Sequence, residues 1–472
     1  DPAMDGSADV FVTKFNASGK GLIYSTFLGG PVMEGAYCLT VDAAKSVYFG
    51  GYAYDGFPTK NAYDSTYDDS KHGDYFDAII VKLNALGSLS YSTYLGKGDD
   101  DVVYAIAVDG AGENQGAAYL FVASQGGADN WGLVKKLVPD DPADDDIFGI
   151  AVGLAGDYAV VGAGGTDGAG IDEGAAYIFY RDQGGPDNWG LVKKLTASDA
   201  DDGDGFGFAV AIDGDTVIVG SDGADGTGTD EGAAYVFSRD YGGPDNWGQV
   251  AQLVSGEPDD GNQFGFAVDI DGDYAVVGSP GEDGDGVDRG MAYIFSRDLG
   301  GADNWGRIGE FSPSDIPDST WLGTAVAIDG ALAVIGSAWE DGAGTNRGAV
   351  YVLGRDYGGL DSWGRVKKLV AGDEHDDDLF GYAVAVDGDE ILVGAGWARG
   401  GGTERGQAYL FSRDEGGTDN WGEVQRLRAS DAANEDWFAS TVAIDGLYIV
   451  AGAPGEDGAG ADRGAAYVFR RL

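Results

Sequence analysis

The sequence has 472 residues, 84 of them glycine, and its 80 acidic and 29 basic residues give a net charge of −51. This charge excludes binders of nucleic acid or anionic membranes, which need clustered Lys and Arg, and suits divalent cations, basic partners or a saline medium. Cys38 is the single cysteine, so the chain has neither an intrachain disulfide nor a Cys-rich metal site.

The N-terminal segment predicts strands at 9–16 (DVFVTKFN) and 21–28 (GLIYSTFL). The stretch 9–30 is echoed at 77–98 (DAIIVKLNALGSLSYSTYLGKG), and FPTKNAYD lies between them at 57–64. These motifs resemble a bacterial propeller repeat called SBBP, which implies that residues 1–110 form propeller blades. The first strands of two blades are expected near Cys38 and at Ala105–Asp109.

Beyond about position 110 the sequence repeats at a constant step, which is the distance from Phe206 to Phe264. FGFAVAIDGD at 206–215 returns as FGFAVDIDGD from 264 and as FGYAVAVDGD from 380, and weaker copies start at Phe148, Leu322 and Phe438. A second landmark keeps the same step: Trp131, Trp189, Trp247, Trp305, Trp363 and Trp421. A fixed period of this size predicts a repeat architecture.

One repeat, residues 206–255, predicts four strands. The first, 206–214, is apolar on both faces and is expected to be buried on both sides, and Asp213-Gly214 then predicts a two-residue hairpin. The second strand is expected at 216–220, the third at 233–240 and the fourth at 247–254. Copies of the fourth strand carry paired lysines, such as Lys193-Lys194, which are typical of exposed sheet edges. The fold class is therefore all-β.

Four-stranded antiparallel units of this length predict the blades of a closed β-propeller. Phe206-Gly207 and Gly452-Ala453-Pro454 resemble the two halves of the FG-GAP repeat, which forms the propellers of integrin α-subunits and of many bacterial surface proteins. We expect one propeller over 1–472, with SBBP-like blades and ring-closing strands in 1–110 and FG-GAP-like blades in 111–472.

The number of blades follows from counting first strands, which gives eight. The stretch from Asp109 to Trp131 is shorter than the equivalent stretch from Asp213 to Trp247 by about one strand and its loop, so seven blades are expected if this short unit joins a neighbour. The last repeat stops in its third strand at 464–472. We therefore expect the N-terminal segment 1–30 to complete the blade that begins at Phe438.

The loops between second and third strands carry acids at both ends of a Gly-rich turn, as in DGTGTD at 225–230. Calcium takes six to eight oxygen ligands from such flexible loops. The candidate calcium ligands are Asp167, Asp172, Asp225, Asp230, Glu282, Asp283, Asp285, Asp288, Asp341, Asp457 and Asp462. The copy from Glu282 to Asp288 is the richest, whereas Arg399 makes the fifth copy metal-free.

The calcium loop of integrin-type blades does not carry over, because it lies between strands one and two, where this sequence has only a short hairpin. Two alternatives to calcium stay open. Asp and Gly are also ordinary turn residues, and Asp288, Glu404 and Asp462 each precede an Arg that could pair with them locally. The acidic charge could instead reflect a saline habitat.

Other acids lie in the loops between fourth and first strands, at 140–146, 199–205 and 373–378, and a solvated surface explains them. The repeated tryptophans are expected to pack between blades rather than to stack on sugars. His72 and His375, the only histidines, lie in unlike acidic loops, which argues against a Ser-His-Asp or metal-histidine site.

These patterns favour an extracellular or cell-surface propeller, not an enzyme, that binds a protein or glycan ligand in adhesion and is stabilised by calcium. The alternatives are a structural subunit of a surface layer, sheath or filament, with self-association, and a polysaccharide-acting enzyme that uses a carboxylate pair. No nucleic-acid partner and no membrane insertion are expected.

Overall fold

The computed structural model describes residues 10–15, 22–28, 34–41, 47–53, 57–60, 77–83, 88–95, 115–123, 131–226, 228–256, 259–284, 286–357, 359, 362–373, 375–399, 401–456 and 464–471. The chain divides into two compact units, residues 1–113 and 114–472. All regular elements of the described residues are β-strands, which confirms the all-β class. None of the described segments is a helix able to cross a membrane.

The first unit contains two antiparallel sheets. They are β1 (Val10–Phe15) with β2 (Leu22–Leu28), and β3 (Glu34–Val41), β4 (Val47–Ala53), β5 (Asp77–Leu83) and β6 (Leu89–Leu95) in that order. The strands expected at 9–16 and 21–28 are confirmed. The pairs β1–β2 and β5–β6 both shift register after a lysine, at Lys14 and at Lys82. The two segments that are similar in sequence therefore also form similar strand pairs.

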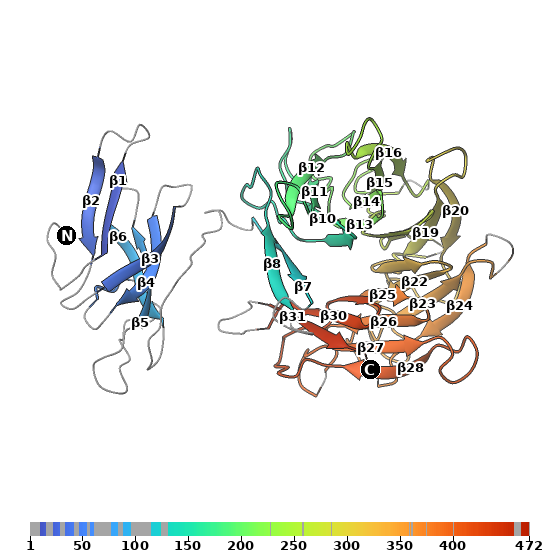
Figure 1. Cartoon of the computed structure of the whole chain (residues 1–472). Helices are drawn as coiled ribbons and strands as arrows, with labels where there is room; N and C mark the ends of the chain where they lie inside the picture. The colour runs from blue at the N-terminus through green and yellow to red at the C-terminus, as the bar shows by residue number, and fades with distance from the viewer. Residues whose placement is uncertain are drawn as a thin grey trace. The chain divides into compact units, whose positions relative to one another are not determined.

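The second unit is a ring of antiparallel sheets (Figure 1). It starts with the pair β7 (Ala118–Val122) and β8 (Gly132–Leu137). The first three blades are β9 (Val152–Ala155), β10 (Tyr158–Ala163), β11 (Ala175–Tyr180) and β12 (Gly190–Leu195); β13 (Ala209–Asp213), β14 (Thr216–Ser221), β15 (Ala233–Ser238) and β16 (Gly248–Leu253); and β17 (Ala267–Asp271), β18 (Tyr274–Ser279), β19 (Met291–Ser296) and β20 (Gly306–Phe311).

The next three blades are β21 (Val326–Asp329), β22 (Leu332–Ser337), β23 (Ala349–Gly354) and β24 (Gly364–Leu369); β25 (Ala383–Asp387), β26 (Glu390–Ala395), β27 (Gln407–Ser412) and β28 (Gly422–Leu427); and β29 (Thr441–Asp445), β30 (Tyr448–Ala453) and β31 (Ala465–Arg470). Five blades thus have four strands each, and the sixth has three within the described residues.

Six blades of three or four described strands are found, fewer than the eight or seven expected. The strand near Cys38 belongs to the first unit's sheet, where β3 pairs with β4, and Ala105–Asp109 lies outside the described residues. The expectation that the segment 1–30 completes the last blade concerns the two units together and stays a prediction.

The shortened unit expected after Asp109 begins outside the described residues, and from Gly116 onward the chain keeps the register of the later repeats. Gly116 bridges Phe148 in parallel, as Gly174 bridges Phe206 one repeat step later. The sequence is therefore in unbroken register from Gly116 onward. By the same step, the sequence position of Asp109, which lies outside the described residues, corresponds to that of Asp167 rather than to that of Asp213.

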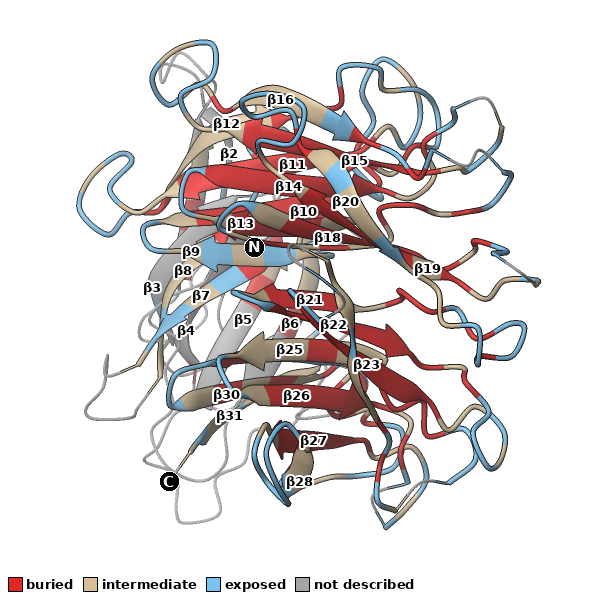
Figure 2. Ribbon diagram, turned by 90° about the vertical axis from the view of Figure 1, so that its right-hand side faces the viewer, coloured by how far each residue is buried: buried red, intermediate tan, exposed pale blue. Residues whose placement is uncertain are grey.

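The two middle strands are the most buried in the five four-stranded blades. All six residues of β14 are buried, and its Val217, Ile218 and Val219 are 0% exposed, as the red bands in Figure 2 show. The first strand is less enclosed than expected, because its residues line the central channel of the ring, a cavity of about 390 Å³. The fourth strand is outermost and half-buried.

Neighbouring blades are joined by repeated backbone contacts. Gly232, before the third strand of the second blade, bridges Phe264 at the start of the third blade, and the same bridge joins each of the first five blades to the next. Gly232 has a φ of 80°, and a Cβ there would lie 2.1 Å from the Phe264 carbonyl oxygen. Both observations require glycine at this position.

The Asp-Gly hairpins form a second set of contacts between blades. The Asp213 carboxylate accepts a hydrogen bond from Gly272 N–H of the next hairpin at 2.9 Å, and Asp271 accepts one from Gly330 at 2.7 Å. The two later bonds join Asp329 to Gly388 and Asp387 to Gly446. The hairpin acid therefore has a role beyond its own turn.

Candidate functional site

The loops between second and third strands are closed by their first acid. The Asp225 carboxylate accepts a 2.9 Å hydrogen bond from the backbone N–H of Asp230, which is how Asp stabilises turns. The same bond joins Asp172 to Asp167 at 3.1 Å, Asp288 to Asp283 at 3.0 Å and Asn346 to Asp341 at 3.1 Å. The first acid thus has a structural role in these four loops.

The last residue of the pattern is set by its backbone conformation. Asp230 has a φ of 53°, in the left-handed region that Asp and Asn tolerate better than most residues. Its carbonyl oxygen accepts a hydrogen bond from Gln263 N–H of the next blade at 3.1 Å. Positive φ recurs at Asp172 (54°), Asp288 (47°), Asn346 (49°) and Glu404 (50°).

The residue after the pattern connects two blades where it is arginine. Arg289 donates from Nε to Asp318 of the following loop at 2.8 Å, and Arg347 donates to Asp376 at 3.0 Å. These bonds lower the pKa of Asp318 and of Asp376. The local pair expected between Asp288 and Arg289 is therefore replaced by a pair between blades.

Calcium coordination by these loops stays a prediction. In the described residues no group of three or more His, Cys, Asp and Glu side chains is arranged to hold a metal. Three of the candidate ligands, Asp285, Asp457 and Asp462, lie outside the described residues. Of the other candidates, three lie in the loop from Glu282 to Asp288, and the remaining loops hold one or two each.

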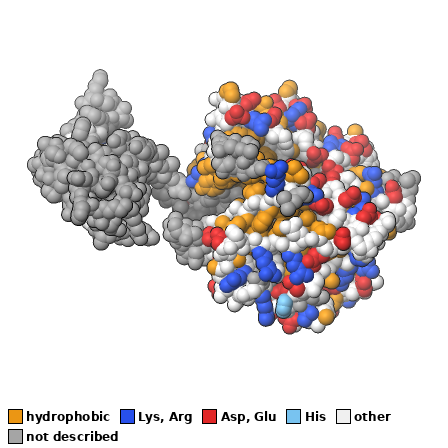
Figure 3. Space-filling view, turned by 60° about the horizontal axis from the view of Figure 1, so that its bottom comes forward, with side chains coloured by type: hydrophobic (Ala, Val, Ile, Leu, Met, Phe, Trp, Pro, Cys, Tyr) orange, Lys and Arg blue, Asp and Glu red, His pale blue; other side chains and the backbone are white. Residues whose placement is uncertain are grey.

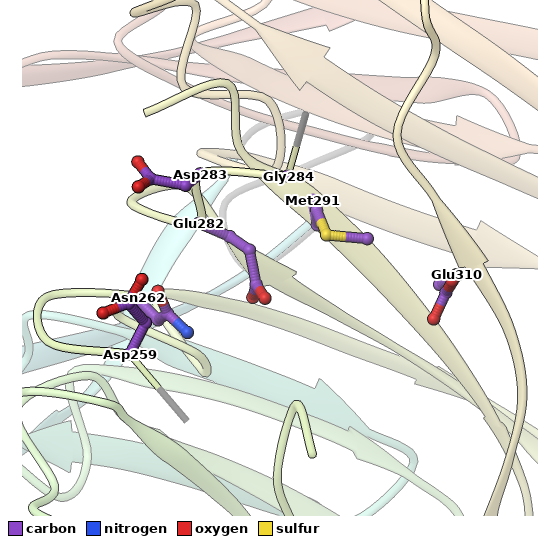
Figure 4. Close-up of a pocket in the computed structure, with 7 residues that line it drawn as sticks. All are labelled: Asp259, Asn262, Glu282, Asp283, Gly284, Met291 and Glu310. Carbon is purple, nitrogen blue, oxygen red and sulfur yellow. The ribbon is translucent and has the colours of Figure 1, made fainter. Parts of the chain in front are cut away.

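An acidic cavity of about 370 Å³ lies in the third blade (Figure 4), where the richest loop was expected. It is lined by Asp259, Asn262, Glu282, Asp283, Gly284, Met291 and Glu310. Glu282 is 5% exposed and accepts a hydrogen bond from the Ser279 hydroxyl at 3.0 Å. The carboxylates of Asp259, Asp283 and Glu310 are exposed around it.

A tyrosine–carboxylate pair recurs in every blade and was not predicted. The Tyr351 hydroxyl donates to Glu340 at 2.9 Å, and Lys368 also contacts that carboxylate. The other pairs are Tyr177–Asp141, Tyr235–Asp199, Tyr293–Glu282, Tyr409–Asp373 and Tyr467–Asp431. Burial, and then the carboxylate, raises the pKa of each tyrosine.

The sequence did contain a signal for these pairs. Tyrosine stands at one position of every third strand, and a Lys or Arg often lies across from it on the fourth, as Lys194 lies across from Tyr177. The carboxylate is harder to find, because in two blades it comes from the loop before the third strand and in four from the loop before the first.

One acid in most loops between fourth and first strands is buried, contrary to the solvated surface expected there. Asp204 is 3% exposed and accepts a hydrogen bond from Asp201 N–H at 2.8 Å. Its counterparts in other repeats are Asp146, Asp378 and Asp436, which are 1%, 1% and 2% exposed. Burial raises the pKa of Asp146, Asp204 and Asp378. The other described acids of these loops are mostly exposed.

The packing role expected for the repeated tryptophans is confirmed. Trp247 is 1% exposed and meets Tyr158 of the preceding blade edge-on, with ring centroids 5.4 Å apart. Trp189, Trp305 and Trp421 are 5%, 2% and 2% exposed. Such burial leaves these indole faces unavailable to sugars.

Comparison with known protein families gives a match over most of the second unit. The family model described as FG-GAP repeat matches residues 131–179, 189–237, 247–295, 305–353, 363–411 and 421–469. Each segment holds one fourth strand and the first three strands of the following blade, so the matches coincide with the structural period. A search of curated proteins found no match.

Proposed function

This chain belongs to the FG-GAP repeat family, and on that premise we propose that it is a non-catalytic binding protein of the cell exterior that holds a protein or glycan ligand in adhesion. A propeller of this family suits binding because its blades supply a rigid scaffold for many loops. The six blades are built alike, which favours a scaffold for binding loops over a single active site.

The observation that carries the proposal is the acidic cavity of the third blade. All the charged residues that line it are acidic, and a concave site of one charge sign attracts cationic groups. Carboxylates also accept hydrogen bonds from the amino and hydroxyl groups of peptides and sugars. The ligand surface we expect is therefore polar and carries basic groups.

Calcium is the proposed cofactor. The loops that flank the cavity offer carboxylate and carbonyl oxygens, the ligands that calcium takes in flexible loops. Extracellular calcium modules work at dissociation constants of about 0.1–1 mM, which suits the proposed location. In this proposal calcium stiffens the loops and the cavity contacts the ligand.

The ligand proposal is tested with the full chain on arrays of basic proteins and of glycans, at about 0.15 M NaCl. Asp259→Asn removes a cavity charge and should weaken binding of the identified ligand at least threefold. Asp201→Asn is the matched control, because Asp201 is the equivalent residue one repeat earlier. The carboxylates of Asp259 and Asp201 each accept a hydrogen bond from the backbone N–H of the next residue. Equal losses in both variants, or cleavage of an arrayed glycan, would contradict the proposal.

A structural subunit of a surface layer, sheath or filament is the second candidate. It is favoured by the edge of β7, which pairs with β8 on one side only among the described strands, since a free strand edge lets chains join. Electron micrographs of the purified protein separate the two candidates, because the subunit should form ordered polymers and the binding protein discrete rings.

A further inference from the structure

The strand pair β7–β8 occupies the position of a seventh blade in the second unit. Lys135 of β8 donates to Asn188 of the first blade at 3.2 Å, as Lys367 donates to Asn420 between the fourth and fifth blades at 3.1 Å. On its other side Trp131 meets Tyr448 of the sixth blade edge-on at 5.4 Å. This is the contact that Trp247 makes with Tyr158.

The described strands of this seventh position are the two outer strands of a blade. In the register of the repeat, β7 corresponds to β11 and β8 to β12, which are a third and a fourth strand. In the first blade β10 pairs with β11, and β9 pairs with β10. None of the described strands takes the corresponding places beside β7.

Exposed apolar side chains of the described residues lie where the inner strands pack in the complete blades. Tyr119 and Phe121 of β7 are 54% and 51% exposed, whereas the corresponding Tyr177 and Phe179 are 0% and 3% exposed. Val152 on the facing strand β9 is 62% exposed, against 9% for its counterpart Val210. An exposed apolar patch of this kind marks an interaction site.

A cavity of about 460 Å³ lies at this place, and its lining is mostly apolar. It is lined by Ala118, Tyr119, Leu120, Phe121, Leu137, Val152, Gly153, Leu154, Ala159, Val160, Val161, Ala443 and Asp445. These residues come from β7, β8, β9, β10 and β29, so the cavity lies between the first and the sixth blades. Hydrophobic side chains also gather in the middle of the face shown in Figure 3, with charged side chains around them.

We propose that the edge of β7 is a docking site for an extended strand of a separate polypeptide chain, with the small and β-branched apolar residues of a second propeller strand. The complete blades show what fits: the strand beside the third strand has the sequence YAVVGA, TVIVGS, YAVVGS, LAVIGS or EILVGA. Added strands gain affinity from main-chain hydrogen bonds and specificity from side-chain pockets.

The register of the added strand follows from the first blade. There Val160 lies opposite Ile178 in an antiparallel pair, so the guest residue that replaces Val160 should lie opposite Leu120. Its alternate side chains then face Tyr119 and Phe121 on one side and Val152 on the other. This site is separate from the acidic cavity, so it does not depend on the ligand or the calcium proposed above.

The test uses the full chain and a peptide with the sequence of residues 156–165, flanked by lysines for solubility and labelled for fluorescence anisotropy. We expect saturable binding and slower hydrogen exchange at the amides of Tyr119–Val122. A control peptide carrying Val160→Asp and Val161→Asp should bind at least tenfold more weakly, because both apolar faces of the strand are then charged.

Two matched variants locate the site. Val152→Asp should weaken peptide binding at least tenfold, whereas Val287→Asp makes the same change at a loop residue of similar exposure, 55%, and should leave binding unchanged. Both side chains are exposed, so neither change should unfold the protein. Absence of binding, equal losses in both variants, or β7 amides already protected without peptide because the chain's own residues cover them would each overturn the proposal.

Discussion

Asp269 is the one charged residue among those that line the central channel. Its carboxylate accepts hydrogen bonds from Ile270 N–H at 2.9 Å and from Ile328 N–H of the next blade at 2.8 Å. Burial is the largest influence and raises the pKa of Asp269 to about 7, although these two bonds act against the rise. The first strands of neighbouring blades have Ala211 and Ala327 at this position.

The raised pKa predicts a pH-dependent loss of stability. Ionisation of Asp269 costs more free energy in the folded state than in the unfolded state. The resulting loss of stability is complete above pH 7, and it disappears as the pH falls towards 4, where the carboxyl of an unfolded Asp is protonated. Asp269→Asn should therefore raise the free energy of unfolding by about 1–3 kcal/mol at pH 8, with partial exposure to the channel allowed for.

Urea unfolding from pH 4 to pH 8 measures this effect. Asp269→Ala is the control, because it removes the charge and the hydrogen-bond acceptors together. Both variants should show a smaller pH dependence between 4 and 7 than the parent, and the alanine variant should gain less stability. Some pH dependence remains, because burial also raises the pKa of Asp222 to about 6. A difference from the parent that stays constant across this range would show that the charge of Asp269 is not the cause.

At the scale of the element, each third strand holds a loop in place through its tyrosine. In the fourth blade the acceptor Glu340 is 3% exposed, so the Tyr351 hydroxyl and the Lys368 ammonium replace the water that this carboxylate would otherwise bind. In the sixth blade the corresponding Asp431 is exposed and accepts the Tyr467 hydroxyl at 2.8 Å. The same pair therefore occurs in two different surroundings.

Tyr351→Phe should lower the free energy of unfolding by about 1–3 kcal/mol, because a buried carboxylate loses one of its partners. Tyr467→Phe makes the same change where water can take the place of the hydroxyl, and it should cost less than about 0.5 kcal/mol. Denaturant unfolding of the full chain compares the two. A larger loss in the sixth blade would show that burial of the carboxylate does not control the strength of the pair.

The strands were predictable because their pattern is local. Val210 and Ile212 of β13 share one face, and a hairpin signal follows them, so a few neighbouring residues identify the strand and its end. The inner strand nevertheless begins at Ala209, later than the expected start at Phe206. Phe206 instead belongs to the bridge with Gly174 of the preceding blade, a contact that no local pattern contains.

The candidate site was less predictable because Asp and Gly have the same pattern in a turn as in a metal loop. The Asp225 carboxylate accepts a hydrogen bond from the backbone N–H of Asp230, so a contact within the turn accounts for this acid. The composition of the loop does not reveal that contact. The buried Asp204 was likewise missed, since the other acids of its loop, such as Asp201 and Asp202, are exposed. Burial of single acids depends on contacts between blades rather than on the charge of the segment.

At the scale of the whole molecule, a net charge of −51 makes stability sensitive to ions. If the loops bind calcium, millimolar calcium should raise the melting temperature even in about 0.5 M NaCl, where surface charges are largely screened, and chelator should reverse it. The gain is about 2.7 kcal/mol at a hundredfold excess over Kd. If the acids only repel one another, NaCl should account for most of the stabilisation.

Two variants connect this response to one loop. Asp283→Asn removes a charge and keeps the oxygen that accepts from Asp288 N–H, and it should reduce the calcium-induced rise in melting temperature. Glu404→Gln lies in the loop that has Arg399 instead of an acid and keeps an acceptor for the Trp437 indole, so its calcium response should match the parent. The same response in both variants would exclude the Asp283 loop as the site.

The Gly–Phe bridges have a consequence for how such a chain can evolve. The bridge between Gly232 and Phe264 has an equivalent between Gly348 and Phe380, so neighbouring blades are joined by the same kind of contact at both junctions. Unequal recombination between two copies of the coding repeat can therefore remove or add one whole repeat without creating an unfamiliar junction. Variation among descendants of this gene should then come in whole blades, with limits set by the curvature of the ring.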